Sequence, residues 1–154
     1  MDDAVRARLV EQSEAFMRRC GYTGILAIEY FVKGGELYFN EMAPRPHNSG
    51  HYTIEGCTTN QFRELCRYLL GEPLQEPRLV APTVMKNILG EDLAAAEAVA
   101  AETGAEGAQS PEEGVYVHLY GKSVSKPKRK MGHITFVGMT AGEYDARWRG
   151  RFVE

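Results

Sequence analysis

Two prolines, Pro44 and Pro46, limit the fold of this chain most strongly, because they directly follow a strand-like run. Proline removes a backbone donor from a helix and pushes the residue before it into an extended conformation. The stretch from Asn40 to His51 is therefore expected to be an open path. Within twelve positions it displays a carboxylate, a guanidinium, two imidazoles and amide groups. This mixture predicts a ligand site, and the alternative is a polar surface loop.

Length and composition narrow the class of protein. The chain has 154 residues, 44% of them hydrophobic and 25% charged, which suits one well-buried domain. No apolar run approaches the roughly 20 residues of a membrane helix, so we expect no membrane partner. The three cysteines, Cys20, Cys57 and Cys66, form no Cys-x-x-Cys pair. The chain opens with no signal-peptide pattern, so a reducing cytoplasm is expected.

Apolar spacing and turn residues predict an α+β fold. Residues 1–72 are expected to form an antiparallel sheet with helices, and residues 73–154 a smaller strand-rich lobe. In the first part, the pattern predicts a helix that stops at Gly21, strands at 25–32 and 37–42, and a helix that opens with a Thr58–Gln61 capping box and ends at Gly71.

The second part alternates strands with two helices. Strands are predicted at 84–89, 115–120 and 132–137, a helix at 93–103 that ends at Gly104, and a loop at 107–114. A capping box at Thr140 and Glu143 predicts a terminal helix. One side of that helix would carry Tyr144, Trp148 and Phe152.

The register of the first hairpin bears on chemistry. A two-residue turn at Gly34-Gly35 would place Glu29 and Glu41 on opposite faces, and each face would mix charged and aromatic residues. A three-residue loop, Gly34-Gly35-Glu36, would instead set Glu29 opposite Glu41. The other face would then be nearly all apolar, and we therefore predict this register; that face would carry Leu26, Ile28, Tyr30, Val32, Tyr38 and Met42.

Opposed carboxylates need compensation. Paired Cβ atoms lie about 4.5–5.5 Å apart, so two glutamates there repel. Mg²⁺ takes one or two carboxylates together with phosphate oxygens and water, which makes Glu29 and Glu41 candidate metal ligands beside a nucleotide. The alternative is a pair of solvated surface glutamates.

A basic run interrupts an otherwise mildly acidic chain of net charge −3. Five cations and no acid fall within nine residues; they are Lys122, Lys126, Lys128, Arg129 and Lys130. A nucleic-acid site would carry more interleaved aromatic residues and a broader positive surface. We therefore expect a phosphate-binding loop and no nucleic-acid partner, with a solvated loop as the alternative.

Together these motifs resemble a known family. The stretch Asn40–His51, with Glu29 before it and Tyr120-Gly121-Lys122 and residues 129–133 after it, is similar to the C-terminal half of N5-carboxyaminoimidazole ribonucleotide synthetases. These are ATP-grasp ligases of purine biosynthesis, the ATPase subunit of phosphoribosylaminoimidazole carboxylase. The resemblance implies that ATP, Mg²⁺, bicarbonate and 5-aminoimidazole ribonucleotide are bound and that the amine is carboxylated through carboxyphosphate.

The resemblance also implies a role for each candidate residue. Glu29 and Glu41 would bind magnesium, and Asn40 with Glu41 would contact ATP. Arg45 would stabilise anionic oxygens during catalysis, since its planar fork suits phosphate or bicarbonate; the alternative is pairing with a nearby acid. The remaining residues would bind the substrate, the cations through its 5′-phosphate; they are His47, Asn48, His51, Lys122, Arg129 and Lys130. Each histidine could instead be held only by backbone hydrogen bonds.

Two features depart from the family pattern. Ser123 stands where an acid commonly follows the Tyr-Gly-Lys step, which leaves the positions of Lys126 and Lys128 open. The glycine-rich phosphate lid and the lysines for the α- and β-phosphates are not found, so the chain alone is expected to be inactive. An exposed sheet edge favours a homodimer. A non-catalytic binding module or a dimerisation domain is the alternative function.

Overall fold

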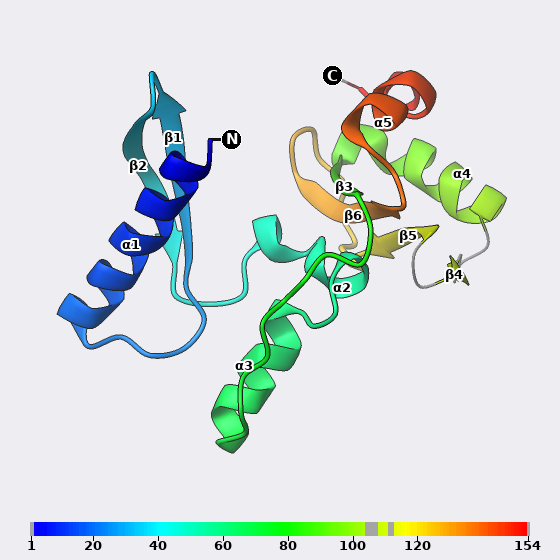
Figure 1. Ribbon diagram of the computed structural model, residues 1–154. Helices are drawn as coiled ribbons and strands as arrows, with labels where there is room; N and C mark the ends of the chain where they lie inside the picture. The colour runs from blue at the N-terminus through cyan, green and yellow to red at the C-terminus, as the bar shows by residue number, and fades with distance from the viewer. Residues whose placement is uncertain (1, 104–107, 111–112, 154) are drawn as a thin grey trace. The chain divides into compact units, whose positions relative to one another are not determined.

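The computed structural model describes residues 2–103, 108–110 and 113–153, which fall into two compact units (Figure 1). The N-terminal unit comprises residues 1–50 and 61–74, and the C-terminal unit comprises residues 51–60 and 75–154. The expected α+β class is confirmed. Within the described ranges, every helix is too short or too polar to cross a membrane.

Helix α1 (Asp3–Cys20) packs along a two-stranded hairpin in the N-terminal unit (Figure 1). It begins where the Asp2 side chain accepts the N–H of Ala4 at 2.7 Å, and it ends at Gly21, whose φ is +60°. A left-handed glycine at this position is a common helix stop. The hairpin strands are β1 (Ala27–Lys33) and β2 (Glu36–Ala43).

The hairpin turn differs from the expected loop. Lys33 pairs with Glu36, so the turn contains only Gly34 and Gly35. Their φ values of +58° and +80° are those that a tight two-residue hairpin turn requires, and glycine adopts them without steric cost. The prediction of a three-residue loop is therefore wrong.

An extra residue in β2 nevertheless produces the predicted pairing of the two glutamates. The register shifts between Glu29 and Tyr30: Tyr30 pairs with Phe39, whereas Glu29 pairs with Glu41. Asn40 is the additional residue of a β-bulge, in which two residues of one strand oppose one of the other. The opposition of Glu29 and Glu41 is confirmed, but a bulge rather than the loop length causes it.

The bulge also changes the apolar face of the hairpin. Tyr38 pairs with Phe31 on the side of Glu29, so its predicted place on the apolar face is wrong. Leu37 and Phe39 lie on that face instead, and Leu26 precedes the strand. Together with α1, this face forms an open hollow of about 440 Å³ that is lined by Gln12, Phe16, Ile28, Tyr30, Phe39 and Met42.

Helix α3 (Gln61–Leu70) begins without the predicted capping box. The Thr58 hydroxyl accepts the N–H of Arg78 at 3.2 Å, and the Gln61 side chain bonds to the backbone of His47. Both side chains are therefore used for contacts between distant segments rather than for the helix start. The helix still ends at Gly71, whose φ is +69°, as predicted.

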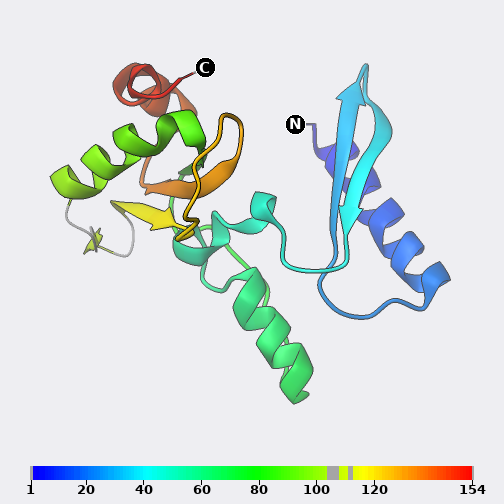
Figure 2. The same ribbon diagram turned by 180° about the vertical axis from the view of Figure 1, so that it is seen from behind.

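The C-terminal unit is built on an antiparallel sheet with strand order β3-β6-β5-β4. Helices α4 and α5 lie on one face of the sheet and the short helix α2 on the other, as Figure 2 shows from behind. The elements are α2 (Thr53–Gly56), β3 (Thr83–Leu89), α4 (Leu93–Thr103), β4 (Ala108–Ser110), β5 (Glu113–Leu119), β6 (Lys130–Val137) and α5 (Ala141–Arg147).

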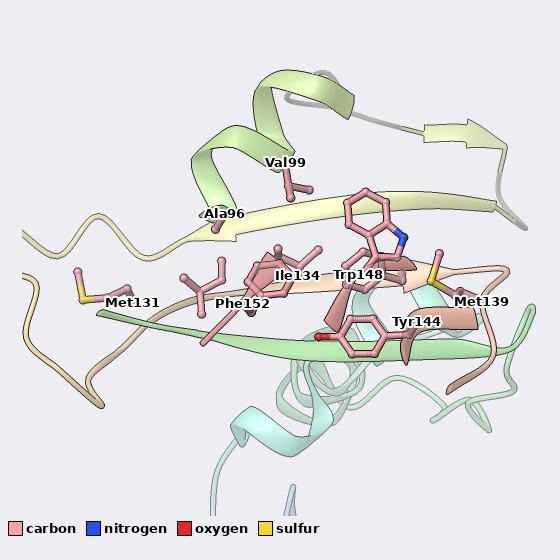
Figure 3. Packing of buried hydrophobic residues seen from close by; sticks show 10 residues of the cluster. Ala96, Val99, Met131, Ile134, Met139, Tyr144, Trp148 and Phe152 are labelled. Carbon is pink, nitrogen blue, oxygen red and sulfur yellow. The ribbon is translucent and has the colours of Figure 1, made fainter. Parts of the chain in front are cut away.

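The hydrophobic core lies between the sheet and the pair α4 and α5. Ala96 and Val99 point from α4 toward the sheet, where they meet Ile134 (Figure 3). Tyr144 and Trp148 pack against the Phe136 ring at centroid distances of 5.3 and 5.1 Å. Alternation along β6 therefore leaves its other face for polar residues.

The chain end follows the prediction with one change. Thr140 and Glu143 form the expected capping box. The helix stops at Arg147 and a 3₁₀ turn (Arg149–Arg151) follows, so Trp148 and Phe152 lie beyond the helix and their predicted place on it is wrong. Together with Tyr144, both residues are nevertheless buried.

The expected loop at 107–114 is wrong at two places, because residues 108–110 form β4 and β5 starts at Glu113. Residues 107 and 111–112 and the predicted helix stop at Gly104 lie outside the described residues.

A fully buried carboxylate, that of Asp92, anchors the chain end to the C-terminal unit. Its Oδ2 accepts from Lys86 Nζ at 2.9 Å and from the Leu89 N–H, and its Oδ1 accepts the N–H of Val153 at 2.8 Å. Burial raises its pKa, but these hydrogen bonds and the charge of Lys86 outweigh burial, so the pKa lies below its usual range. The carboxylate is therefore ionised at neutral pH.

Candidate functional site

The N-terminal unit brings together two carboxylates and an imidazole, which we call the carboxylate cluster: Glu29, Glu41 and His47. Nδ1 of His47 lies 3.7 Å from Oε1 of Glu29, and Nε2 lies 3.5 Å from Oε1 of Glu41. One ligand atom from each residue lies within 4.8 Å of the others. In the bulge, Asn40 donates from Nδ2 to Oε2 of Glu29 at 3.2 Å. The strand pairing and the bulge thus turn four polar groups toward one point.

His47 is held in this position by its own backbone. Gln61 donates from Nε2 to the His47 carbonyl and accepts the His47 N–H at Oε1, both at 2.8 Å. A Cβ atom at Gly50 would lie 2.7 Å from Oε1 of Gln61, so the glycine makes room for this clamp. The imidazole Nδ1 also lies 2.8 Å from the Ser49 hydroxyl. The segment after the prolines is therefore an ordered path.

The carboxylate cluster fits a divalent cation. Two facing carboxylates repel each other, and a cation with oxygen ligands removes that repulsion. The Glu41 side chain is 60% exposed and that of Glu29 37% exposed, so both are open to an ion and to a phosphate group. A protonated His47 would relieve the same repulsion without a metal.

Arg45 and Asn48 lie on either side of His47 in the sequence. Arg45 is exposed and donates from Nη1 to the carbonyl of Pro46 at 3.0 Å. Among the residues that the structure describes, no carboxylate lies within ion-pair distance of its guanidinium, so nothing supports the alternative in which Arg45 pairs with an acid. Asn48 is half-buried and opens the 3₁₀ turn Asn48–Gly50.

The C-terminal unit holds a second group, the histidine cluster: His51, His118 and His133. His118 and His133 are paired across β5 and β6, and their rings stack at a centroid distance of 4.5 Å. The His51 ring lies 5.0 Å from that of His133. Glu55 approaches from α2, with Oε1 at 2.6 Å from Nε2 of His118. This cluster occupies the polar face of the sheet.

His133 is kept neutral within this cluster. It is 2% exposed, and burial, followed by the neighbouring His118 and His51, lowers its pKa to about 3. Its Nδ1 lies 2.9 Å from the hydroxyl of Tyr120. A neutral imidazole has one donor and one acceptor, so His133 orients the tyrosine rather than supplying charge.

The tyrosine connects the histidine cluster to the basic residues. Lys122 Nζ lies 5.4 Å from the centre of the Tyr120 ring and donates to the carbonyl of Lys130. Arg129 donates from Nη1 to the carbonyl of Val124 at 2.8 Å. Lys122 and Arg129 are thus folded onto the backbone of one loop and keep further donors for a ligand.

The predicted site residues divide between the units. Glu29, Asn40, Glu41 and His47 come together in the N-terminal unit, which also holds Arg45 and Asn48; His51, Lys122, Arg129 and Lys130 belong to the C-terminal unit.

Sequence reasoning missed Glu55, Gln61 and His118 and gave His133 and Tyr120 no role. The available signal was alternation, since His118 lies near the end of the predicted strand 115–120 and Tyr120 follows it by two residues, which would place both on one face.

Two family models match this chain. Residues 1–62 match the ATP-grasp domain, and residues 83–147 match the phosphoribosylaminoimidazole carboxylase C-terminal domain. The N5-carboxyaminoimidazole ribonucleotide synthase of Vibrio cholerae is 41% identical over 140 residues, which is 91% of this chain and 34% of that protein. The chain spans about a third of the length of such curated relatives.

Solved structures of the same enzymes share the fold. The N5-carboxyaminoimidazole synthetase of Staphylococcus aureus, in complex with ADP, superposes with a TM-score of 0.81 at 35% identity and covers 99% of this chain and 39% of that one. The enzyme of Aspergillus clavatus, in complex with ADP and 5-aminoimidazole ribonucleotide, gives a TM-score of 0.75 at 32% identity, covering 98% and 40%.

The fold and the match of residues 1–62 to the ATP-grasp domain therefore define a chain of the ATP-grasp superfamily. Within that superfamily the chain belongs to the N5-carboxyaminoimidazole ribonucleotide synthase family and corresponds to its C-terminal portion. The resemblance noted in the sequence is confirmed.

Proposed function

We propose that this chain supplies part of the metal, nucleotide and substrate sites of an ATP-dependent ligase. The ligase joins bicarbonate to the amine of 5-aminoimidazole ribonucleotide, with ADP and phosphate as the other products. The observation that carries the proposal is the bulge at Asn40, which sets Glu29 opposite Glu41 with His47 between them. Family membership supports the substrate assignment.

In this proposal Glu29 and Glu41 hold Mg²⁺, and Asn40 and Glu41 contact ATP. Magnesium neutralises the phosphate charges that must approach each other when bicarbonate attacks. The hydrogen bond from Asn40 orients the Glu29 carboxylate, and the clamp from Gln61 fixes His47 beside it. Orientation of this kind lets the site accept an ion without rearrangement.

Arg45, Asn48 and the histidines His47 and His51 bind the reacting groups in this proposal. The exposed guanidinium of Arg45 has donors in the flat fork that matches bicarbonate or phosphate oxygens. Lys122, Arg129 and Lys130 bind the substrate's 5′-phosphate. Their support is the basic loop itself, in which Lys122 and Arg129 are ordered by backbone carbonyls.

We further propose that residues 1–72 form the C-terminal part of an ATP-grasp domain and residues 73–154 its C-terminal lobe. The whole reaction needs groups for the remaining phosphates of ATP, so we expect no turnover from this chain alone. The few unpaired cysteines fit a function in the cytoplasm.

Calorimetry tests the proposal through two separate ligands. Titration of the chain with 5-aminoimidazole ribonucleotide is expected to show weak binding that the K122A substitution abolishes. Titration with Mg-ADP is expected to show weak binding that E41Q abolishes. Silence with both ligands would contradict the proposed function.

Self-association is a second candidate function, favoured by exposed apolar side chains in the N-terminal unit. Phe31, Phe39, Leu69 and Leu70 are each more than half exposed, and an isolated two-stranded sheet is marginal in water. Large apolar side chains that a folded unit leaves exposed are a feature of interaction surfaces. Sedimentation measurements are expected to show a homodimer, and a monomer at all concentrations would exclude it.

A further inference from the structure

We infer that Glu91 is a positioning residue for the basic loop: its carboxylate holds a strained turn at residues 126–129 and so fixes the cations that bind phosphate. This inference rests on the proposed function, because it concerns the loop assigned to the 5′-phosphate. Glu91 itself need not touch the substrate. It lies in the short 3₁₀ turn Gly90–Asp92 that follows β3.

The basic loop contains a turn in an unfavourable conformation. The N–H of Arg129 donates to the carbonyl of Lys126 at 3.1 Å, which closes a four-residue turn with Pro127 in second place and Lys128 in third. Lys128 has a φ of +61°, and it is the only non-glycine residue with positive φ in the described part of the chain. This arrangement is that of a type II turn, whose third position favours glycine or asparagine. A lysine there is strained, because its Cβ crowds the following carbonyl oxygen.

Contacts with the 3₁₀ turn offset this strain. The N–H of Lys128 donates to Oε2 of Glu91 at 2.8 Å, a hydrogen bond strengthened by the charge of the carboxylate. The Ser125 hydroxyl donates to the carbonyl of Gly90 at 3.1 Å. A Cβ atom at Gly90 would lie 2.1 Å from the carbonyl oxygen of Lys126, so only glycine permits this close approach. The loop therefore rests directly on residues 90 and 91.

The turn positions the backbone that holds the phosphate-binding side chains. Arg129 is its last residue, and its guanidinium reaches back to the carbonyl of Val124. Lys122 reaches the carbonyl of Lys130, the residue that follows the turn. Both side chains are thus bound to backbone that the turn at 126–129 places. If the turn opens, Lys122 and Arg129 are no longer held at fixed positions relative to each other.

The two roles that Glu91 could have predict opposite effects of its removal on the affinity for the phosphate group. As a bare negative charge in contact with the basic loop, Glu91 would weaken anion binding, so any neutral substitution would strengthen it. As a positioning residue it strengthens binding through the Lys128 N–H. Glutamine keeps an acceptor oxygen at this place, whereas alanine keeps none.

The test is an NMR titration of the full chain with 5-aminoimidazole ribonucleotide. We expect E91A to weaken the affinity about fivefold to tenfold and E91Q to bind at least as tightly as the unaltered chain. E97A, at an exposed glutamate of α4, is the matched control and is expected to change nothing. Unaltered Trp148 fluorescence confirms that each variant is folded.

A rescue experiment separates strain from charge. E91A/K128G and E91A/K128A carry the same charge, but only glycine removes the strain at φ +61°. We expect the glycine variant to bind the ribonucleotide several times more tightly than the alanine variant. Equal affinities, or an E91A variant that binds as tightly as the unaltered chain, would overturn the inference alone. Absence of binding by the unaltered chain would overturn the proposed phosphate site and the inference with it.

Discussion

The carboxylate cluster and the histidine cluster handle charge in opposite ways. Glu29 and Glu41 face each other at an exposed site, so their repulsion calls for a cation from outside or a proton on His47. His133 is buried and neutral, and its Nδ1 is paired with Tyr120 inside the unit. The difference is that the N-terminal unit leaves its charged groups open to an external cation, whereas the C-terminal unit keeps His133 neutral by burial.

This comparison predicts that the largest loss of stability arises inside the C-terminal unit. Removal of the buried Asp92 carboxylate leaves Lys86 and two backbone donors unpaired. We expect D92A to lower the free energy of unfolding by about 3–5 kcal/mol. Trp148, the single tryptophan, lies in the core of this unit and reports its urea unfolding by fluorescence.

The control for D92A is D145A, which breaks an exposed ion pair with Arg149. Such pairs contribute about 0–1 kcal/mol. If the two substitutions cost the same, the buried anchor is not what stabilises this unit.

The second prediction concerns the pH dependence of the histidine cluster. The pKa of His133 is about 3 in the folded chain, against about 6.5 when unfolded, so between these values the unfolded chain binds the additional proton. Its contribution to stability is complete above about pH 6.5 and falls by up to about 1.4 kcal/mol per pH unit as the pH is lowered toward 3. We expect H133Q to show a shallower decline in unfolding free energy over that window.

Direct NMR titration of the His133 ring supplies the check. Its signals are expected to stay at the neutral position down to at least pH 5. Titration near pH 6.5 would show that burial does not hold the ring neutral. The contrast between the two clusters would then be wrong for the histidine cluster.

The smallest expected effect lies in the hairpin turn of the N-terminal unit. Gly35 has a φ of +80°, so G35A should destabilise the hairpin by about 1 kcal/mol. Faster hydrogen exchange at the β1 and β2 amides would report this loss. The matched control is G142A in α5, where a Cβ meets no atom within 4 Å and a helix gains from alanine. Equal exchange in both variants would argue against the two-residue turn.

Local patterns in the sequence predicted much of the fold. Helix α4 has the predicted bounds, and the Thr140–Glu143 capping box is present. Both depend on residues within a few positions of each other. The Thr58–Gln61 capping box has the same spacing but is wrong, because Gln61 binds the backbone of His47, 14 residues away. Spacing alone does not show which partner a polar side chain will choose.

The candidate site was predicted for a partly wrong reason. Side-chain pattern correctly required Glu29 to face Glu41, but the sequence does not reveal a bulge, because an extra residue in one strand and an extra residue in the loop give the same pairing. Tyr38 and Phe39 distinguish the two, since the bulge exchanges their faces. The histidine cluster stayed hidden because its members meet only once the pairing of β5 with β6 is known.

We propose above all that the bulge at Asn40 builds a divalent-cation site from Glu29, Glu41 and His47. Titration with Mn²⁺, followed by its electron paramagnetic resonance signal, tests this most directly. We expect one saturable site per chain with an affinity on the order of 10⁻⁴ to 10⁻³ M. E41Q should lose it, and E36Q, at an exposed glutamate of the same strand, should keep it. Absence of saturable binding, or equal binding by E41Q and the unaltered chain, would contradict the account.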